Sequence, residues 1–199
     1  MARKWWTLLA VSVATFMLLL DITVVNTALP SIQKDLGASF TDLQWVIDAY
    51  TLALAAVVLT AGSIADRIGR RAVFAAGLGL FAIASLAAGL SPDATFLNIS
   101  RAVQGIGAAA MFAVSLALVA QEFPAGKERA TAMGVYGASI GVAVAVGPLV
   151  GGAITSGLGW RWVFFINVPI GIAAIAVTFA KLREYRAIRT RPVWTGSGW

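Results

Sequence analysis

Six apolar stretches dominate this sequence, and each is close to the ~20 residues that a helix needs to cross a bilayer core of about 30 Å. The breaks between them are short and contain turn-forming residues, among them Pro30, Gly37 and Pro92. Short connections make neighbouring spans run antiparallel and pack side by side. We therefore predict an all-α membrane protein, a six-transmembrane-helix bundle over residues 8–180, with spans at 8–29, 44–65, 72–90, 95–120, 131–156 and 162–180.

The composition argues against most other classes of protein. The chain is 59% hydrophobic and only 12% charged, whereas soluble domains hold about 25% charged residues. A net charge of +6 would suit nucleic acid, but the basic residues lie in short clusters between apolar stretches, so we expect no nucleic-acid partner. The sequence has no cysteine and no histidine. Because it also shows no nucleophile–base pair and no phosphate-binding loop, we expect no enzyme, metal or organic cofactor.

The distribution of Lys and Arg predicts the orientation in the membrane. Twelve of these residues lie within 1–7, 62–71, 124–129 and 181–199, against Lys34 and Arg161 on the other side. Since short basic loops are retained in the cytoplasm, both termini are predicted to be cytoplasmic in a multi-pass cell-membrane protein. Residues 181–199 are polar and are predicted to form a disordered basic tail. The alternative, a cleaved signal peptide, is disfavoured by the long apolar run and the missing cleavage site.

Three charged residues, Asp21, Asp48 and Arg101, lie inside the predicted spans. A charge at the bilayer centre costs about 2.5–3.5 kcal/mol on insertion scales, so each needs a polar cavity or a partner. At 1.5 Å per residue, they lie roughly 12, 6 and 9 Å from the outer ends of their helices, so we predict that they line one cavity. Asp48 facing the lipid headgroups and Arg101 serving only as a packing partner remain open alternatives.

Asp21 is the predicted proton-binding carboxylate. Desolvation disfavours a charged carboxylate and a nearby cation favours it, so the two effects together can let one group gain and lose a proton. Arg101 is the predicted cation, and Gln104, one turn along the same helix face, is a polar neighbour. Replacing Asp21 with Asn is expected to abolish proton-coupled flux in a complete transporter.

The fifth span holds a second unusual pattern, Gly147-Pro148-Leu149-Val150-Gly151-Gly152, after Gly134, Gly137 and Gly141. Proline removes a backbone hydrogen bond and kinks a helix, and small residues allow close helix contact. Such a helix can hinge or seal, although an ordinary glycine-rich packing face is the alternative.

Several motifs together resemble the major facilitator superfamily. Gly62-Ser63-Ile64-Ala65-Asp66-Arg67-Ile68-Gly69-Arg70-Arg71, a charged turn between spans two and three, is similar to its signature loop. Residues 147–152 are similar to the fifth-span motif of its drug:proton antiporters, with Ala143 where a further glycine is usual. Residues 20–30, which include Asn26, resemble the first-span motif of the fourteen-span EmrB/QacA type, as do 45–50, 101–105 and 160–162.

The resemblance implies roles for these residues. Gly62, Asp66, Arg67, Gly69, Arg70 and Arg71 would form a cytoplasmic gate motif, in which Asp66 contacts a helix end of the opposite half. Gly147, Pro148, Gly151 and Gly152 would seal the bundle against leak. Asp21, Asp48, Asn26, Arg101 and Gln104 would couple protons and line the cavity for a lipophilic or cationic small molecule, with the proton as coupling ion.

The chain contains only one six-helix bundle, whereas facilitators of this type have two. Two functions therefore compete: an amino-terminal half of a proton-coupled drug exporter, working with a second half or a second copy, and a truncated non-transporting membrane protein or interaction module.

Overall fold

The computed structural model describes residues 3–182 and 184, and within them the chain is helical. The helices are α1 (Arg3–Leu36), α2 (Phe40–Ile68), α3 (Arg70–Gly89), α4 (Ala94–Glu122), α5 (Lys127–Gly157), α6 (Trp162–Phe165) and α7 (Asn167–Lys181). In the described part of the chain, six helices are long and apolar enough to cross a membrane when α6 and α7 are taken as one. The predicted all-α six-helix bundle is therefore confirmed.

The predicted spans fall within these helices except for Leu90, which follows α3, and Ile166, which separates α6 from α7. The break predicted at Pro30 is wrong, because α1 continues through Pro30 to Leu36 and Gly37 ends it at a φ of 59°. Burial of Ile32 accounts for the continuation, since this last part of the helix still packs into the core. Of the predicted tail 181–199, only Lys181, Leu182 and Glu184 lie within the described residues.

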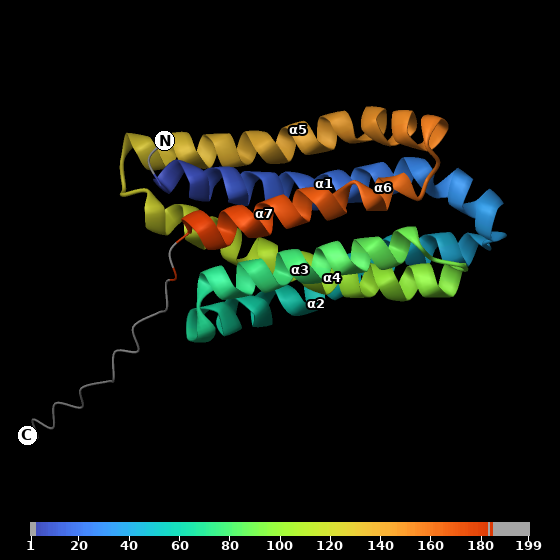
Figure 1. The fold of residues 1–199 in the computed structure, drawn as a ribbon, viewed down its shortest axis with the longest axis horizontal. Coiled ribbons are helices and arrows are strands. Elements are labelled where there is room, and N and C mark those ends of the chain that lie inside the picture. The colour runs from blue at the N-terminus through green and yellow to red at the C-terminus, as the bar shows by residue number, and fades with distance from the viewer. Residues whose placement is uncertain (1–2, 183, 185–199) are drawn as a thin grey trace, which may run out of the picture.

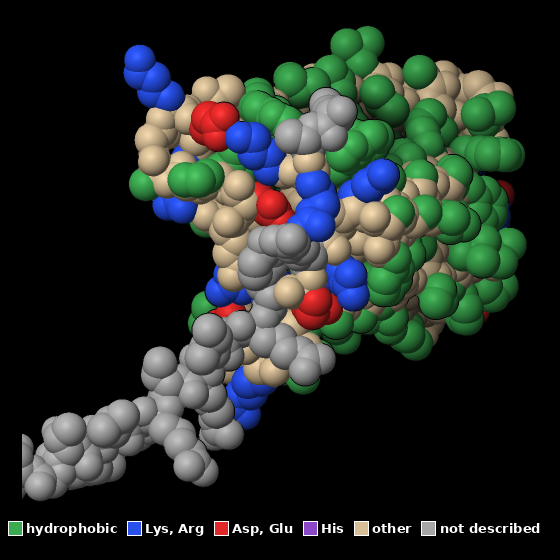
Figure 2. All heavy atoms as spheres, turned by 60° about the vertical axis from the view of Figure 1, so that its left-hand side comes forward, with side chains coloured by type: hydrophobic (Ala, Val, Ile, Leu, Met, Phe, Trp, Pro, Cys, Tyr) green, Lys and Arg blue, Asp and Glu red, His purple; other side chains and the backbone are tan. Residues whose placement is uncertain are grey.

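The helices lie side by side along one long axis (Figure 1). Helix α1 packs mainly on α5, α2 and α3 pack on α4, and α7 joins the two groups by packing on both α3 and α1. The start of α1, the α2–α3 and α4–α5 connections and the end of α7 share one end of the bundle (Figure 1). Lys and Arg side chains gather at this end, while the side of the bundle is largely hydrophobic (Figure 2).

Local chemistry fixes where the helices begin. Ser39 caps α2 in a reciprocal capping box, in which the Asp42 amide donates to Ser39 Oγ at 3.2 Å and the Ser39 amide donates to Asp42 Oδ2 at 2.9 Å. Asp93 caps α4 by accepting the amide of Phe96 at 2.8 Å. Pro169 has no amide proton for the carbonyl four residues earlier, which accounts for the interruption at Ile166 between α6 and α7.

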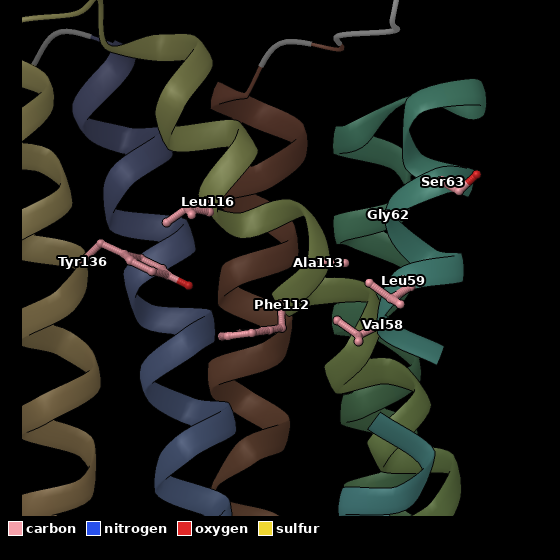
Figure 3. Close-up of a pocket in the computed structure, with 8 residues that line it drawn as sticks. All are labelled: Val58, Leu59, Gly62, Ser63, Phe112, Ala113, Leu116 and Tyr136. Atoms are coloured by element: carbon pink, nitrogen blue, oxygen red, sulfur yellow. The ribbon is translucent and has the colours of Figure 1, made fainter. Parts of the chain in front are cut away.

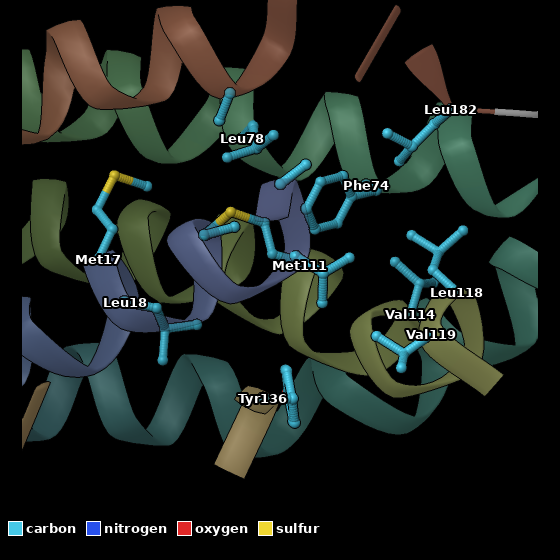
Figure 4. Packing of buried hydrophobic residues seen from close by; sticks show 14 of the residues in the cluster. Met17, Leu18, Phe74, Leu78, Met111, Val114, Leu118, Val119, Tyr136 and Leu182 are labelled. Atoms are coloured by element: carbon cyan, nitrogen blue, oxygen red, sulfur yellow. The ribbon is translucent and has the colours of Figure 1, made fainter. Parts of the chain in front are cut away.

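The core lies between α1, α3, α4 and α7, where Met17, Phe74, Leu78 and Met111 are buried (Figure 4). Helices α2 and α5 contribute much less to it. Only 17% of the most apolar 18-residue stretch of each helix is buried, against 61% of the corresponding stretch of α1 and of α3. Both helices therefore present a long apolar face that no described part of this chain covers.

Candidate functional site

A cluster of buried polar side chains surrounds Asp21 in the middle of the bundle. Asp21 is 2% exposed, and its carboxylate accepts hydrogen bonds from three side chains. Arg101 Nη1 donates to Oδ2 at 2.5 Å, Gln104 Nε2 donates to Oδ1 at 2.9 Å and Asn167 Nδ2 donates to Oδ1 at 2.8 Å. The donors come from α4 and α7, so the carboxylate ties α1 to both helices.

Arg101 is held by more than its ion pair. Its Nε donates to the carbonyl oxygen of Val46 on α2 at 2.9 Å, and its Nη1 also donates to Gln104 Oε1 at 2.6 Å. Its guanidinium carbon lies 4.2 Å from the ring centroid of Tyr50, close enough for a cation–π interaction. A buried charge is tolerated only when it is paired and hydrogen-bonded, and Arg101 meets both conditions.

Ser85 on α3 completes the cluster. Its hydroxyl donates to its own helix at Phe81 O and accepts from Gln104 Nε2 at 2.8 Å and from Asn167 Nδ2 at 3.5 Å. Each of these side chains therefore has a defined partner, and the cluster joins α1, α3, α4 and α7. Helix α2 joins it through the Val46 carbonyl and the Tyr50 ring.

The structure brings together Asp21, Arg101 and Gln104, as the sequence predicts, but it separates Asp48 and Asn26 from them. Asp48 is exposed on the face of α2 opposite Val46 and Tyr50. Asn26 is exposed on α1 and donates to the Ile22 carbonyl at 2.8 Å. The prediction of one cavity lined by all the charged residues is thus wrong, because equal depth in the membrane does not make helices turn the same face to one another.

An open pocket of about 550 Å³ lies on the uncovered face, between α2, α4 and α5. Figure 3 shows its lining: Val58, Leu59, Gly62 and Ser63 from α2, Phe112, Ala113 and Leu116 from α4, and Tyr136 from α5. A second pocket of about 200 Å³ shares Phe112 and includes Ile22 and Thr51. Asn26 and Asp48 lie one turn beyond Ile22 and Thr51 on their helices, so this face carries both polar side chains.

The gate motif is more helical than the predicted turn. Helix α2 runs to Ile68 and α3 starts at Arg70, so Gly69 alone separates them. Gly69 has a φ of 119°, which L side chains rarely adopt. Asp66 and Arg70 form an ion pair at 2.9 Å, and Arg67 is exposed.

Arg71, the last residue of the motif, contacts the segment after α7. Its backbone amide donates to Glu184 Oε1 at 3.2 Å, its Nη1 donates to the Leu182 carbonyl at 3.2 Å, and its Nε lies 3.5 Å from Glu184 Oε2. Glu184 thus holds the first turn of α3, where backbone amides lack helical partners.

The fifth-span motif divides between two faces of α5. Gly147 and Gly151 pack on α1, where an added Cβ would lie 1.8 Å from Thr23 Oγ1 and 2.1 Å from Thr27 Oγ1 respectively. Pro148 and Gly152, each one position further along the helix, are exposed on the adjacent face. Half of the motif therefore enables the close contact between α1 and α5, and half belongs to the uncovered face.

Sequence reasoning missed Asn167, Ser85 and Glu184. Asn167 is a polar residue in an apolar span and lies two residues before a proline, so the sequence does mark this position as a candidate. Ser85 sits in a Gly/Ala-rich span without such a signal, and Glu184 lies in a polar segment with no periodicity.

Comparison with known proteins places the chain in a family. Residues 11–195 match the family model described as Major Facilitator Superfamily. The chain is 47% identical over 173 residues to the puromycin resistance protein pur8 of Streptomyces alboniger, covering 87% of this chain and 34% of that protein. It is 42% identical over 196 residues to the tetracenomycin C resistance and export protein of Streptomyces glaucescens, covering 98% of this chain and 36% of that protein.

Solved structures agree on the fold. A crystal structure of a bacterial homologue of the human lysosomal transporter Spinster, described as inward-facing and unoccupied, has a TM-score of 0.78 at 23% identity and covers all of this chain and 48% of the other. A peptide transporter POT mutant in complex with sulfate has a TM-score of 0.78 at 15% identity, over 90% of this chain and 40% of the other.

The chain spans about a third of the length of the curated relatives named above. Those relatives are resistance and export proteins rather than enzymes, and the described helices fit a multi-pass membrane protein. With a family model matching most of its residues, the chain belongs to the Major Facilitator Superfamily.

Proposed function

We propose that this chain forms one six-helix bundle of a proton-coupled exporter of lipophilic or cationic small molecules, of the fourteen-span drug:proton antiporter type. The buried cluster around Asp21 is the observation that carries the proposal. An ionisable group inside a membrane bundle is costly and is a functional candidate by default. The names of the relatives, which refer to resistance and export, support the same direction.

The cluster suits proton coupling because its hydrogen bonds depend on the charge of Asp21. The charged carboxylate offers two acceptor oxygens to Arg101, Gln104 and Asn167. A proton taken up from water onto either oxygen neutralises the carboxylate and weakens these charge-assisted bonds. Arg101 then keeps its Val46 and Tyr50 contacts without a counter-charge, which favours a different arrangement of α1 against α4.

The uncovered face of α2 and α5 supports the proposal for the substrate. Its pockets are apolar, and Asp48 stands exposed beside them without a hydrogen bond or ion pair to its carboxylate among the described residues. A carboxylate on an apolar wall attracts a lipophilic cation, and Asn26 offers hydrogen bonds nearby. We therefore assign the proton to Asp21 and the contact with substrate to Asp48 and Asn26.

Alternating access requires a second body for this face to move against. We propose that a second bundle, from a longer chain or from a second copy, covers α2 and α5. The gate residues Gly62, Asp66, Arg67, Gly69, Arg70 and Arg71 then act at the cytoplasmic end, while Gly147, Pro148, Gly151 and Gly152 seal α5. The basic end in Figure 2 is proposed to be cytoplasmic, with both termini, in the plasma membrane.

The test uses ethidium, a lipophilic cation, in a pump-deficient bacterial host. The chain is expressed alone and together with the part of the Streptomyces alboniger relative outside the matched 173 residues. We expect energy-dependent ethidium efflux with the pair, its loss in Asp21→Asn, and a raised ethidium concentration at half-maximal rate in Asp48→Asn. Efflux by the pair that is unchanged in Asp21→Asn contradicts the proposal.

A further inference from the structure

Helix α7 is anchored at both ends to residues that have separate proposed roles. Its first residue, Asn167, is 2% exposed and donates to Asp21 Oδ1 at 2.8 Å. The segment after its last residue binds Arg71 of the gate motif through the Leu182 carbonyl and the Glu184 carboxylate. Helix α7 therefore contacts both the proposed proton site and the gate motif.

The helix between these anchors is suited to transmit a displacement. Helix α7 runs over 15 residues from Asn167 to Lys181, about 21 Å between its end residues at 1.5 Å per residue. Only Ile166, which keeps helical backbone angles, separates its start from α6. Its length packs against α3 and α1, the helices that bear the gate junction and Asp21.

The anchor after the C-terminal end of α7 consists of defined contacts of Leu182 and Glu184. Leu182 is 4% exposed and belongs to the same buried cluster as Phe74 and Leu118 (Figure 4). Glu184 lies so close to the α2–α3 junction that a Cβ at position 69 would be 2.2 Å from its Oε1. Glycine at position 69 thus admits Glu184 to the amide of Arg71 as well as providing the turn.

We propose that α7 couples the protonation of Asp21 to the gate junction, with Asn167 and Glu184 as positioning residues at its two ends. This inference rests on the proposed proton-binding role of Asp21. While Asp21 is charged, Asn167 donates to it and α7 stays packed in its present position against α1 and α3. Glu184 then holds the first turn of α3. When a proton from water binds Asp21, Asn167 loses its charged acceptor, α7 shifts, and Glu184 releases Arg71.

The surroundings of Asp21 limit the competing explanations for a pH response. Among the described residues, the charged or titratable side chains that face it are Arg101 from α4 and Tyr50 from α2. Helices α3 and α7 present Ser85 and Asn167, and α5 and α6 present apolar side chains such as Val150 and Val163. At the gate end Glu184 faces Arg71, and Asp21→Asn, which keeps Glu184, controls for a pH response of Glu184 itself.

The test uses the whole chain in lipid nanodiscs. The sequence has no cysteine, so Ile68→Cys and Lys181→Cys place two spin labels, both at exposed positions, across the junction. Pulsed electron paramagnetic resonance measures their separation above and below the pH at which Asp21 takes up a proton. That pH is found by infrared spectroscopy, from the carbonyl band of the protonated acid that disappears in Asp21→Asn.

We expect one distance population while Asp21 is charged and a second, longer one when it is protonated. Asp21→Asn gives the longer population at both pH values, and Asn167→Ala removes the pH dependence of the distance while the infrared band still titrates. Thr178→Val is the matched control, because Thr178 is buried on the same helix and bonds only its own Ala174 carbonyl among the contacts described. It is expected to respond to pH like the parent chain.

Coupling between sites is reciprocal, which gives a second readout. Protonation is expected to change the ratio of the two distance populations about 5- to 150-fold, and Glu184→Gln moves the midpoint of the infrared band by at most the logarithm of the same factor. A pH-dependent distance that persists in Asn167→Ala, or a band midpoint unmoved in Glu184→Gln, overturns the inference and leaves the proton role of Asp21 standing. An Asp21 band that appears at no pH overturns the proposed function itself.

Discussion

Replacing Arg101 with Met tests how far the ion pair of Arg101 and Asp21 stabilises the bundle. Methionine keeps the unbranched stem of arginine as far as Nε but removes the charge and the donors to Val46 O, Asp21 and Gln104. Both partners are almost fully buried, at 2% and 0% side-chain exposure, so the remaining carboxylate has little access to water. Breaking a buried pair from one side costs about 3–5 kcal/mol, and we expect a loss of that size in the free energy of unfolding.

A double-mutant cycle separates the pair from the rest of the cluster. Asp21→Asn with Arg101→Met leaves no uncompensated charge, so its cost is expected to fall below the sum of the single changes by about 3 kcal/mol. Lys4→Met with Glu128→Gln is the matched control, because that ion pair, at 2.6 Å, is 28% and 56% exposed. Exposed pairs contribute about 0–1 kcal/mol.

The assay is reversible unfolding of the whole chain in mixed micelles of dodecyl maltoside and dodecyl sulfate, followed by circular dichroism. Additive costs for Asp21→Asn and Arg101→Met would refute the reasoning, since they would mean that neither residue depends on the other. A coupling as large at Lys4 and Glu128 would also refute it, because burial would then not be the cause.

Four further changes can be measured in the same unfolding assay. Gly151→Leu is expected to cost more than about 2 kcal/mol, because a side chain there meets Thr27 Oγ1, whereas Gly152→Ala, facing open space, is expected to cost nothing. Gly69→Ala is expected to cost about 1–3 kcal/mol, since its φ of 119° suits only glycine. Ser39→Ala is expected to cost about 1 kcal/mol by removing the cap of α2. Equal losses of unfolding free energy in Gly151→Leu and Gly152→Ala would contradict the packing assignment. No loss in Gly69→Ala or in Ser39→Ala would contradict the assignment made for that residue.

The fold and the centre of the site could be predicted from residue type alone. Apolar runs of membrane length leave few alternatives to a helical bundle. Asp21 and Arg101 had to find partners because a lone buried charge is too costly, and each is the partner of the other. Gln104 followed because it lies one turn from Arg101 on the same helix.

The remaining parts depend on helix rotation and on contacts distant in sequence. Depth along a helix places Asp48 near the level of Arg101 but not on the face that meets it. Asn167 reaches Asp21 across 146 positions, and a neutral amide in an apolar span gives a weaker signal than a charge. Glu184 follows the last helix, so no periodicity indicates that it returns to Arg71.

The central claim is that Asp21 carries the proton that drives export. Proteoliposomes containing this chain with a second bundle allow two measurements on one preparation: ethidium accumulation driven by a pH gradient, and ethidium exchange without a gradient. We predict that Asp21→Asn abolishes the gradient-driven accumulation and retains the exchange. Accumulation by Asp21→Asn at the rate of the parent would contradict the account.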